Sequence, residues 1–432
     1  MNECTPDGQS LHTLLTDLAN QLGRASGFVQ RRSKLTGSLF AQAFVLGCLE
    51  EPAATLNNLV QVCHELGVEI TEAGFQQRID AQAVAFLGQL LQAWVTRFRQ
   101  QRPLDDTVLR HFTQVNLLDS TEITLPAALS GLFAGKQGAA LKVQLSFDYL
   151  SGTLNALELT SGRQPDQRCA LLTACASRGS LQLFDLGYFD QTSLAQIDDQ
   201  TAYFVTRFQD QTALYQPDTG QRLELEQLLR QLPYSSAEWS VELGAKARLP
   251  VRLLAERLPE AVVEARRRKA HAKARRWGKT CSQRQLDLLA WNVSITNVPA
   301  DWLTVAQVHL VYRVRWQIEL LFKVCKSQAG LDQIGHWSPA RLQCQLYARL
   351  LGVALFQWLI SPWRFWEAEL SPPKGFRCLR RQTSALGLAL RLGADALTQV
   401  LATLTTAFLR FAQKSRRHKS PSTYQQLVQA AP

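Results

Sequence analysis

The 432-residue chain lacks the cysteine pairs that mark a structural zinc site or a disulfide framework. Its nine cysteines are scattered singly, and none forms a C-x-x-C pair. An odd, dispersed set of this kind is typical of a protein in a reducing compartment and argues against a structural zinc ion.

Segments that would direct the chain to a membrane are also lacking. The opening MNECTPDGQS has neither the basic start nor the apolar run of a signal peptide. The longest apolar segment, near LLGVALFQWLI, is too short for a bilayer span and is interrupted by Gln357. We therefore expect a cytoplasmic protein with no membrane partner.

Acidic residues are outnumbered, with 36 Asp and Glu against 47 Lys and Arg, which gives a formal net charge of +11. The excess is concentrated in two places. Residues 266–279 carry eight Lys and Arg and no acid, and from Arg364 to the end there are eleven against three. Solvated charge runs are common, but two blocks of one sign in a basic chain favour nucleic acid as a partner.

Residues 1–97 show helical spacing of apolar residues throughout. This region predicts a helical domain in which Arg31, Arg32, Lys34 and Arg78 are available to DNA phosphates. A helix-turn-helix spacing is not evident.

The pattern then becomes that of an α/β protein. The apolar run VNLLDST predicts a strand that ends at Asp119, and KVQLSFDYL and TLNALELT predict a hairpin around a Ser-Gly turn. A short helix, QRCALLTACAS, leads to SLQLFDLGYFD, a strand whose end carries Asp185. This order of elements is how a ribonuclease H-like sheet begins.

Further changes in pattern divide the chain into five segments. We predict an α/β fold in which a ribonuclease H-like core is interrupted by an insertion and flanked by helical regions. The segments are a helical DNA-binding domain (1–97), the first part of the core (98–200), a mostly β insertion with the basic run (201–285), the second part of the core (286–364) and a basic helical C-terminal region (365–432).

The stretch VYRVRWQIELLFKVCKS, residues 311–327, predicts one core helix with a polar ridge. At 100° per residue, Tyr312, Arg315, Glu319 and Lys326 fall within an arc of roughly 60°, and Lys323 joins them. The ridge could be a solvated face, because Arg315–Glu319 and Glu319–Lys323 have the spacing of ordinary surface ion pairs.

Two aspartates elsewhere in the chain favour a functional interpretation of the ridge. Asp119, Asp185 and Glu319 can converge if the two strand ends are neighbours and the helix packs behind them. Three carboxylates without a nearby histidine or cysteine suit Mg²⁺ or Mn²⁺, and two such ions can promote phosphodiester chemistry. Arg315, Lys326 and Tyr312 could then hold phosphate oxygens.

These motifs resemble those of the DDE transposases of the insertion-sequence-four family. The intervals between Tyr312, Arg315, Glu319 and Lys326 match the family's Y-x2-R-x3-E-x6-K signature, while LLDST at 117–121 and DLGYFD at 185–190 are similar to its two Asp motifs. WNVSITNVP and the YFVTR segment also fit. The resemblance covers roughly residues 30–420, and Leu186 replaces a basic residue often found after the second Asp.

The resemblance implies a cut-and-paste transposase that uses two Mg²⁺ ions, for which Mn²⁺ could substitute. Asp119, Asp185 and Glu319 would be the catalytic and metal-binding triad. The implied partners are double-stranded DNA, as terminal inverted repeats and target, and a second copy of the chain in the synaptic complex. We expect DNA contacts from the ridge, from Trp291 and Trp316 stacking on an unstacked base, and from the basic run: Tyr312, Arg315, Lys323, Lys326, Trp291, Trp316, Arg266, Arg267, Arg268 and Lys269.

Three alternatives remain at this point. The two tryptophans could instead be core residues. The protein could be a non-catalytic DNA-binding derivative of a transposase, although all three carboxylates are present. It could also be a ribonuclease H-like nuclease with another role, against which the insertion and the ridge argue. A nucleoid-associated bacterial protein is expected in the leading case.

Overall fold

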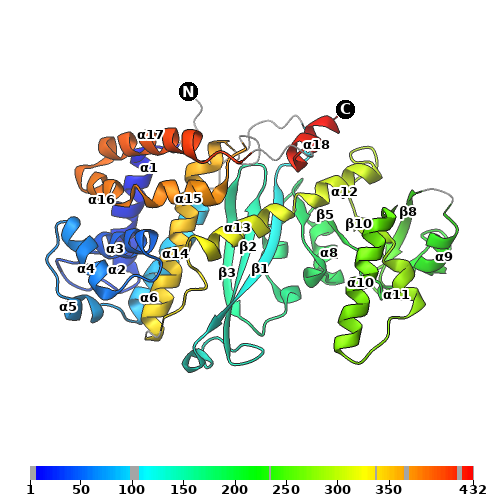
Figure 1. Cartoon of the computed structure of the whole chain (residues 1–432), viewed down its shortest axis with the longest axis horizontal. Helices are drawn as coiled ribbons and strands as arrows, with labels where there is room; N and C mark the ends of the chain where they lie inside the picture. Colours follow the sequence, from blue (N-terminus) through cyan, green and yellow to red (C-terminus); the bar gives the residue numbers. More distant parts are fainter. Residues whose placement is uncertain are drawn as a thin grey trace. The chain divides into compact units, whose positions relative to one another are not determined.

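The computed structural model describes residues 6–97, 107–232, 235–335, 338–363, 369–415 and 421–431. The chain forms two compact units, each assembled from three separate stretches (Figure 1). The first unit contains Met1–Pro103, Asp119–Gln164 and Trp316–Ser420, and the second contains Leu104–Leu118, Pro165–Arg315 and Pro421–Pro432. Residues 416–420 of the predicted basic tail lie outside the described part of the chain.

The first stretch of the first unit is helical, as predicted for residues 1–97. Threonine side chains begin several of these helices: Thr36 accepts a hydrogen bond from the Leu39 N–H, and Thr55 accepts one from the Asn58 N–H. The helices are α1 (Gly8–Thr13), η1 (Leu14–Leu18), α2 (Ala19–Ala25), α3 (Gly37–Glu50), α4 (Leu56–Glu65), α5 (Glu72–Gln76) and α6 (Ala81–Arg97).

The long helix α14 (Pro339–Ile360) packs against α3 and α6 and forms the centre of this unit. Ser338 caps it, and Pro339 occupies its first turn. Together with η5 (Ser361–Trp363), it is long and apolar enough to cross a membrane by length and composition, so the prediction that this segment is too short was wrong. Its apolar window is 94% buried inside the structure, as expected of a core helix.

Helices from the end of the chain complete the first unit. Helix α17 (Ala394–Phe411) packs on α1, on α15 (Pro372–Arg380) and on α16 (Thr383–Leu392). The predicted hairpin is confirmed as β2 (Ala139–Asp148) and β3 (Thr153–Ser161), which pair antiparallel. The remaining elements of this unit are η2 (Ala127–Leu129) and α13 (Trp316–Ser327).

The second unit is organised around a mixed sheet. Its strands are hydrogen-bonded in the order β1-β4-β5-β10-β9-β8-β6-β7. The pairs β1–β4 and β4–β5 are parallel, whereas all later pairs are antiparallel. The strands are β1 (Val115–Leu125), of which the residues up to Leu118 belong to this unit, β4 (Leu181–Leu183), β5 (Tyr203–Arg207), β6 (Leu214–Tyr215), β7 (Arg222–Leu223), β8 (Ser236–Leu243), β9 (Leu249–Arg257) and β10 (Trp291–Thr296).

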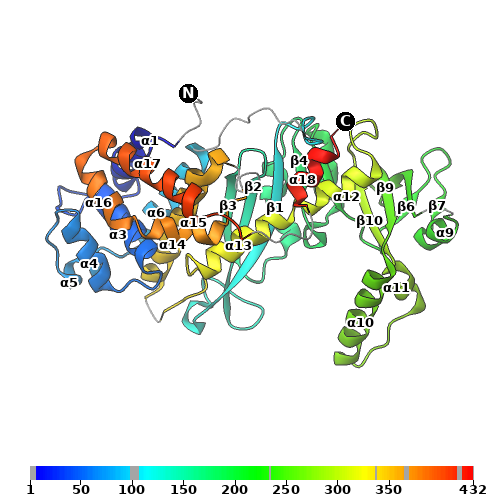
Figure 2. The ribbon, with the colours of Figure 1, turned by 45° about the horizontal axis from the view of Figure 1, so that its top comes forward.

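Helices connect these strands. Two of them, α10 and α11, lie side by side beyond β9 and β10 (Figure 2), so the part of the chain predicted as mostly β also contains a long helix. The helices are η3 (Asp166–Arg168), α7 (Leu171–Ala174), η4 (Leu186–Tyr188), α8 (Gln191–Asp199), α9 (Leu225–Arg230), α10 (Glu260–Arg276), α11 (Gln283–Leu288), α12 (Val305–Arg313) and α18 (Thr423–Gln429).

The core of this unit is apolar and continuous along the sheet. Phe184, Phe204, Leu253 and Ile295 are each fully buried in one cluster. Burial of such side chains stabilises the sheet by roughly 1.5–3 kcal/mol each. Asp119 within β1, Asp185 after β4 and Arg207 at the end of β5 are therefore attached to well-packed strands.

The predicted single helix over residues 311–327 is wrong. Helix α12 ends at Arg313, and α13 begins at Trp316. At the break, the N–H groups of Val314 and Arg315 donate to carbonyls three residues earlier, at Val311 and Tyr312, so the chain forms a tighter turn than an α-helix. Tyr312 and Arg315 consequently belong to the second unit, and Glu319 and Lys326 to the first.

Candidate active site

The two predicted aspartates are related by the register of parallel strands. Strand β1 pairs with β4 so that Leu117 lies opposite Leu183. Asp119 follows Leu117 by two residues along β1, and Asp185 follows Leu183 by two residues. The prediction that Asp119 ends its strand was wrong, because β1 continues to Leu125; the alternating side chains beyond Asp119 include buried Thr121, Ile123 and Leu125.

Asp185 is held at the start of a short helix. Its Oδ1 accepts a hydrogen bond of 2.8 Å from the Gly187 N–H, so it caps η4, and its side chain remains half-buried. A carboxylate that accepts a backbone hydrogen bond has a defined orientation while keeping lone pairs for another ligand. Asp119 is half-buried too, and its Oδ1 accepts a 2.8 Å hydrogen bond from the Ser120 N–H.

Cationic and phenolic groups lie near Asp185 within the second unit. The guanidinium of Arg207, at the end of β5, lies 5.8 Å from the centre of the Tyr312 ring. Burial raises the pKa of the Tyr312 phenol, and the charge of Asp185 raises it further. The positive charges of Arg207 and Arg315 oppose this rise in pKa. Tyr312, Arg315, Asp185 and Arg207 thus form one electrostatic cluster, and Tyr312 keeps its proton at neutral pH as a hydrogen-bond donor.

The remaining ridge residues lie on α13 in the first unit. Glu319 is half-buried in the first turn, where the helix dipole favours a carboxylate. Lys326 donates to the Glu122 carbonyl on β1 at 3.4 Å, while Lys323 is exposed. The side of the stretch opposite the ridge, predicted to be buried, is Leu310, Val314, Ile318, Leu321 and Cys325. The prediction is confirmed for the last four, which are at most 3% exposed, whereas Leu310 is only half-buried.

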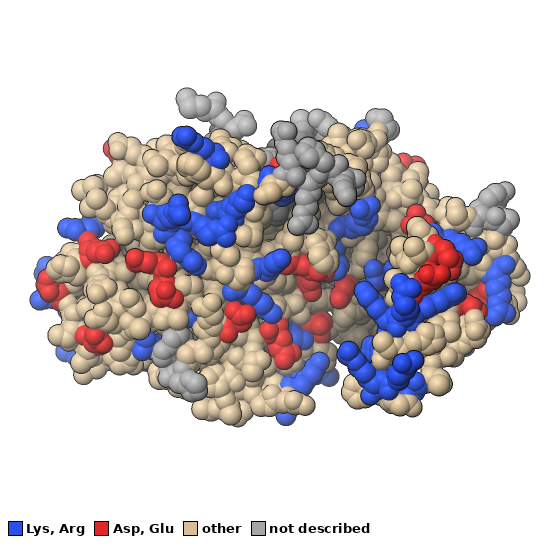
Figure 3. Space-filling view, in the orientation of Figure 1, with Lys and Arg blue, Asp and Glu red and all other residues tan. Residues whose placement is uncertain are grey.

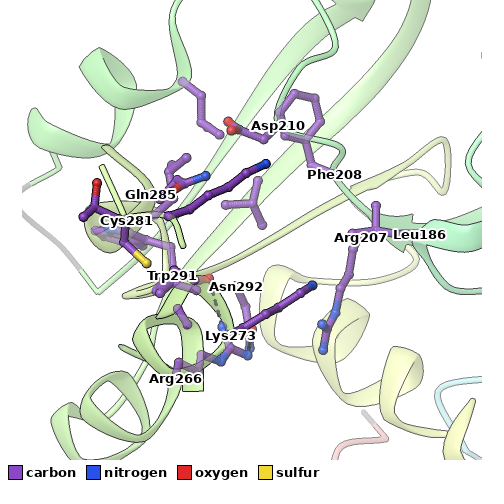
Figure 4. A pocket seen from close by; sticks show the side chains of 18 of the residues that line it. Leu186, Arg207, Phe208, Asp210, Arg266, Lys273, Cys281, Gln285, Trp291 and Asn292 are labelled. Carbon is purple, nitrogen blue, oxygen red and sulfur yellow. Dashed lines mark hydrogen bonds between the residues drawn. The ribbon is translucent and has the colours of Figure 1, made fainter. Parts of the chain in front are cut away.

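The two candidate stacking residues have different environments. Trp316 is 57% exposed at the start of α13. Trp291 is half-buried at the start of β10 and lines a cavity of about 710 Å³ in the second unit (Figure 4). This cavity lies between β5, β10, α10 and α11 and includes Leu186, the residue after Asp185.

Most of the predicted basic run lies on α10 (Glu260–Arg276), and its first three arginines have partners within the protein. Arg266 donates to the Trp291 carbonyl and to Asn292, Arg267 donates to the Leu286 carbonyl, and Arg268 pairs with Glu264 at 3.6 Å. Lys269 is exposed, and so are four later cations. Figure 3 shows Lys and Arg side chains gathered on the surface over α10. These later cations are Lys273, Arg275, Arg276 and Lys279.

Three residues of this region were missed as individual site residues in the sequence. Arg207 is the last residue of the YFVTR segment, but nothing in its spacing relates it to Tyr312. Lys273 lies within the basic run, but the sequence does not show that it is exposed while Arg266 and Arg267 donate hydrogen bonds to other residues. Trp277, 73% exposed and lining the same cavity, carried no sequence signal beyond its basic neighbours.

The donor set is suited to hard divalent cations. Carboxylate oxygens are preferred by Mg²⁺ and Mn²⁺, and the two aspartates occupy matching positions beyond the paired part of adjacent parallel strands. Among the described residues, no three or more His, Cys, Asp or Glu side chains are grouped so as to hold a metal ion. The three-carboxylate site therefore stays a prediction.

Comparisons with known proteins identify the family. Residues 110–355 match the sequence model of the family described as "Transposase DDE domain". A transposase of insertion sequence element IS231B from Bacillus thuringiensis subsp. berliner is 27% identical over 95% of this chain and 92% of its own length. The transposase of IS1151 from Clostridium perfringens is 25% identical over 94% of this chain and 92% of its own length. A solved piggyBac transposase aligns with 98% of this chain and 88% of its own at 10% identity, with a TM-score of 0.44.

The match to the family model covers more than half of the chain and includes both aspartates, the ridge and the sheet of the second unit. Relatives named as insertion-sequence transposases extend the similarity almost to both ends. The chain belongs to the DDE transposase family and is an insertion-sequence transposase.

Proposed function

We propose that this transposase cuts the DNA at the ends of its own element and joins the freed 3′-hydroxyl groups to target DNA. The observation that carries the proposal is the register of β1 and β4, in which Asp119 and Asp185 each follow the Leu117–Leu183 pair by two residues. Carboxylates at equivalent places on adjacent parallel strands belong to the same edge of a sheet. Glu319, in the first turn of α13, is the third carboxylate of the proposed triad.

The proposed chemistry needs a divalent metal, with Mg²⁺ as the natural ion and Mn²⁺ as a substitute. Two ions held by Asp119, Asp185 and Glu319 would activate the attacking oxygen and stabilise the leaving oxygen of a phosphodiester. Arg315 would bind the phosphate through its planar guanidinium, and the protonated Tyr312 phenol would donate to a phosphate oxygen. Lys326 would hold a neighbouring phosphate as a point charge.

The proposed core is ribonuclease H-like, interrupted by an insertion that corresponds to residues 201–285. The parallel strands β1, β4 and β5 support this interpretation, because such a core places its carboxylates after neighbouring strands. The five-segment division stays part of the proposal. So do the helical domain as a DNA-binding module, Trp291 and Trp316 as stacking residues, and Lys323 with Arg266, Arg267, Arg268 and Lys269 as phosphate contacts.

The proposed partners are the terminal inverted repeats, the target DNA and a second copy of the chain in the complex that pairs the two ends. A bacterial cell would hold the protein in its cytoplasm, associated with the nucleoid while bound to DNA. Short inverted repeats framing the gene would identify the DNA ends to use in an assay.

The test is metal-dependent cleavage of a DNA duplex carrying such an end. Asp119→Ala, Asp185→Ala and Glu319→Ala should each abolish cleavage in Mg²⁺ while end binding in EDTA is largely kept. Asp185→Asn is the matched variant, because asparagine is as good a helix cap as aspartate but lacks the charge. Cleavage near the parent rate by any of the four variants would remove that residue from the triad.

A further inference from the structure

Two short turns of the second unit bring another aspartate, Asp166, to the side of Asp185. The turn η3, which follows strand β3, packs against η4, which follows strand β4. The Gln167 side chain of η3 donates from Nε2 to the Phe189 carbonyl at 3.3 Å, and Tyr188 of η4 is 1% exposed in the apolar core. Asp166 and Asp185 lie at the starts of these two turns and are therefore held on one packed base.

The two carboxylates approach each other over Gly187. A Cβ atom on this glycine would lie 3.0 Å from Asp185 Oδ1 and 3.3 Å from Asp166 Oδ2. Asp185 Oδ1 is also the atom that accepts the hydrogen bond from the Gly187 N–H. The backbone φ of Gly187 is not positive, so the conformation does not require glycine. What the glycine provides is space, and carboxylate oxygens from two different turns border that space.

The position of Asp166 is not explained by the start of its own turn. Pro165 occupies the N-cap position of η3, so the Asp166 carboxylate is not the cap. Two carboxylates held close together cost free energy, and a cation beside them offsets that cost. Asp185 is one of the proposed metal ligands, so the cation of the proposed site would lie next to Asp166 as well.

Asp166 would reach that cation through water. Among the described residues, no group of three or more His, Cys, Asp or Glu side chains is placed to hold an ion directly. Mg²⁺ usually keeps several water ligands and takes only one or two carboxylates from a protein. A carboxylate near such an ion accepts hydrogen bonds from those waters, and this outer contact orients the ligands and strengthens binding of the ion.

We propose that Asp166 is a positioning residue of the metal site, which accepts hydrogen bonds from water ligands of the divalent cation bound by Asp185. This inference rests on the proposed function and adds a fourth carboxylate to the proposed triad. It also gives Gly187 a role, because the missing side chain leaves room for water between the two carboxylates.

The experiment measures Mn²⁺ binding to the full chain without DNA, from the electron paramagnetic resonance signal of the free ion, so that the result does not depend on cleavage. The proteins are the parent, Asp166→Asn and Gly187→Ala. The matched control is Asp218→Asn, which changes an exposed aspartate between β6 and β7. The thermal midpoint of each protein is measured in EDTA.

Asp166→Asn should weaken Mn²⁺ binding about tenfold, the loss typical of an outer partner of a metal site, because the amide carries no charge. Gly187→Ala should also weaken it, because the added methyl group displaces the Asp185 carboxylate and fills the space for water. Asp218→Asn should bind Mn²⁺ as the parent does. Mg²⁺ added as a competitor should displace Mn²⁺ from the parent and from the control alike.

An affinity of Asp166→Asn equal to that of the parent would overturn the inference, even if its thermal midpoint in EDTA is lowered. So would a parent protein that binds no Mn²⁺. If Asp166→Asn does not fold, Gly187→Ala decides, and parent affinity in that variant would overturn the inference. The proposed function fails separately, because cleavage of DNA by Asp185→Asn at the parent rate would refute the triad itself.

Discussion

At the scale of single residues, the members of the ridge occupy distinct environments. Arg315 lies in the turn between α12 and α13, beside Tyr312. Lys326 reaches the Glu122 carbonyl from the last turn of α13. For Arg315 and Lys326, the effect of a substitution on stability can therefore be measured separately from its effect on strand joining.

Arg315→Ala should lower the free energy of unfolding by about 1 kcal/mol, the net value of one hydrogen bond. As a phosphate ligand it should lower strand joining by tenfold or more, roughly 1.4 kcal/mol in the barrier. Lys326→Ala should behave likewise with a smaller stability change, and the exposed Lys246→Ala serves as control. Thermal unfolding and strand joining are measured for the parent and for each of the three variants. If both Arg315→Ala and Lys326→Ala join DNA as well as the parent but are less stable, the ridge has only a structural role.

Tyr312 provides a prediction about pH. Burial, together with Asp185, raises the pKa of its phenol in the folded protein above the ordinary value of about 10. The folded state therefore favours the protonated phenol, and this group destabilises the fold only as the pH rises above the unfolded pKa. Tyr312→Phe should lose part of that alkaline destabilisation while changing little at neutral pH. Unfolding by urea at neutral and alkaline pH tests this; identical pH dependence in both proteins would contradict it.

At the scale of elements, sequence patterns predicted the helices of residues 1–97 and the β2–β3 hairpin. These succeed because apolar periodicity and turn residues are local signals. The break at Val314–Arg315 could not be predicted in this way, since neither residue disfavours a helix. The matching positions of Asp119 and Asp185 depend on pairing between strands far apart in sequence, and Arg207 is related to Tyr312 only through the tertiary fold.

Helix α10 carries a prediction of its own. Lys273, Arg275 and Arg276 are exposed, whereas Arg266 and Arg267 donate hydrogen bonds to residues outside α10. Replacing the three exposed cations by Gln should reduce the salt dependence of DNA binding by up to about 3 in the log–log slope. Arg222→Gln, which removes a surface ion pair with Glu224 outside α10, should change it little. An unaltered slope in the triple variant would mean that this face of α10 points away from DNA.

At the scale of the whole molecule, each unit is assembled from distant stretches of chain. In the first unit, Arg349 of α14 is 2% exposed and donates hydrogen bonds of 2.9 Å and 2.7 Å to the carbonyls of Pro52 and Gly330. It therefore joins the loop after α3 to the loop after α13. The spacing of apolar residues in α14 does not predict this role, because Arg349 is a charged residue on an otherwise apolar face of the helix.

Arg349→Leu should destabilise the protein by about 3 kcal/mol, because it leaves buried carbonyls without donors. Arg349→Lys should recover part of this loss, since an ammonium group can still donate to one or two of them. Urea unfolding curves of the two variants give the comparison. Equal stability of Arg349→Leu and the parent would show that the carbonyls find other donors.

The discontinuous first unit also affects the order in which the protein folds during its synthesis. Helices α3 and α6 bury their apolar faces against α14, which the ribosome produces more than 240 residues after the end of α6. The second unit has all its strands by Thr296, before α14 exists. We therefore expect the second unit to fold first while the N-terminal helices remain accessible to chaperones. A copy of the gene interrupted before α14 would encode a protein with an unfinished hydrophobic core, a ready substrate for cellular proteases.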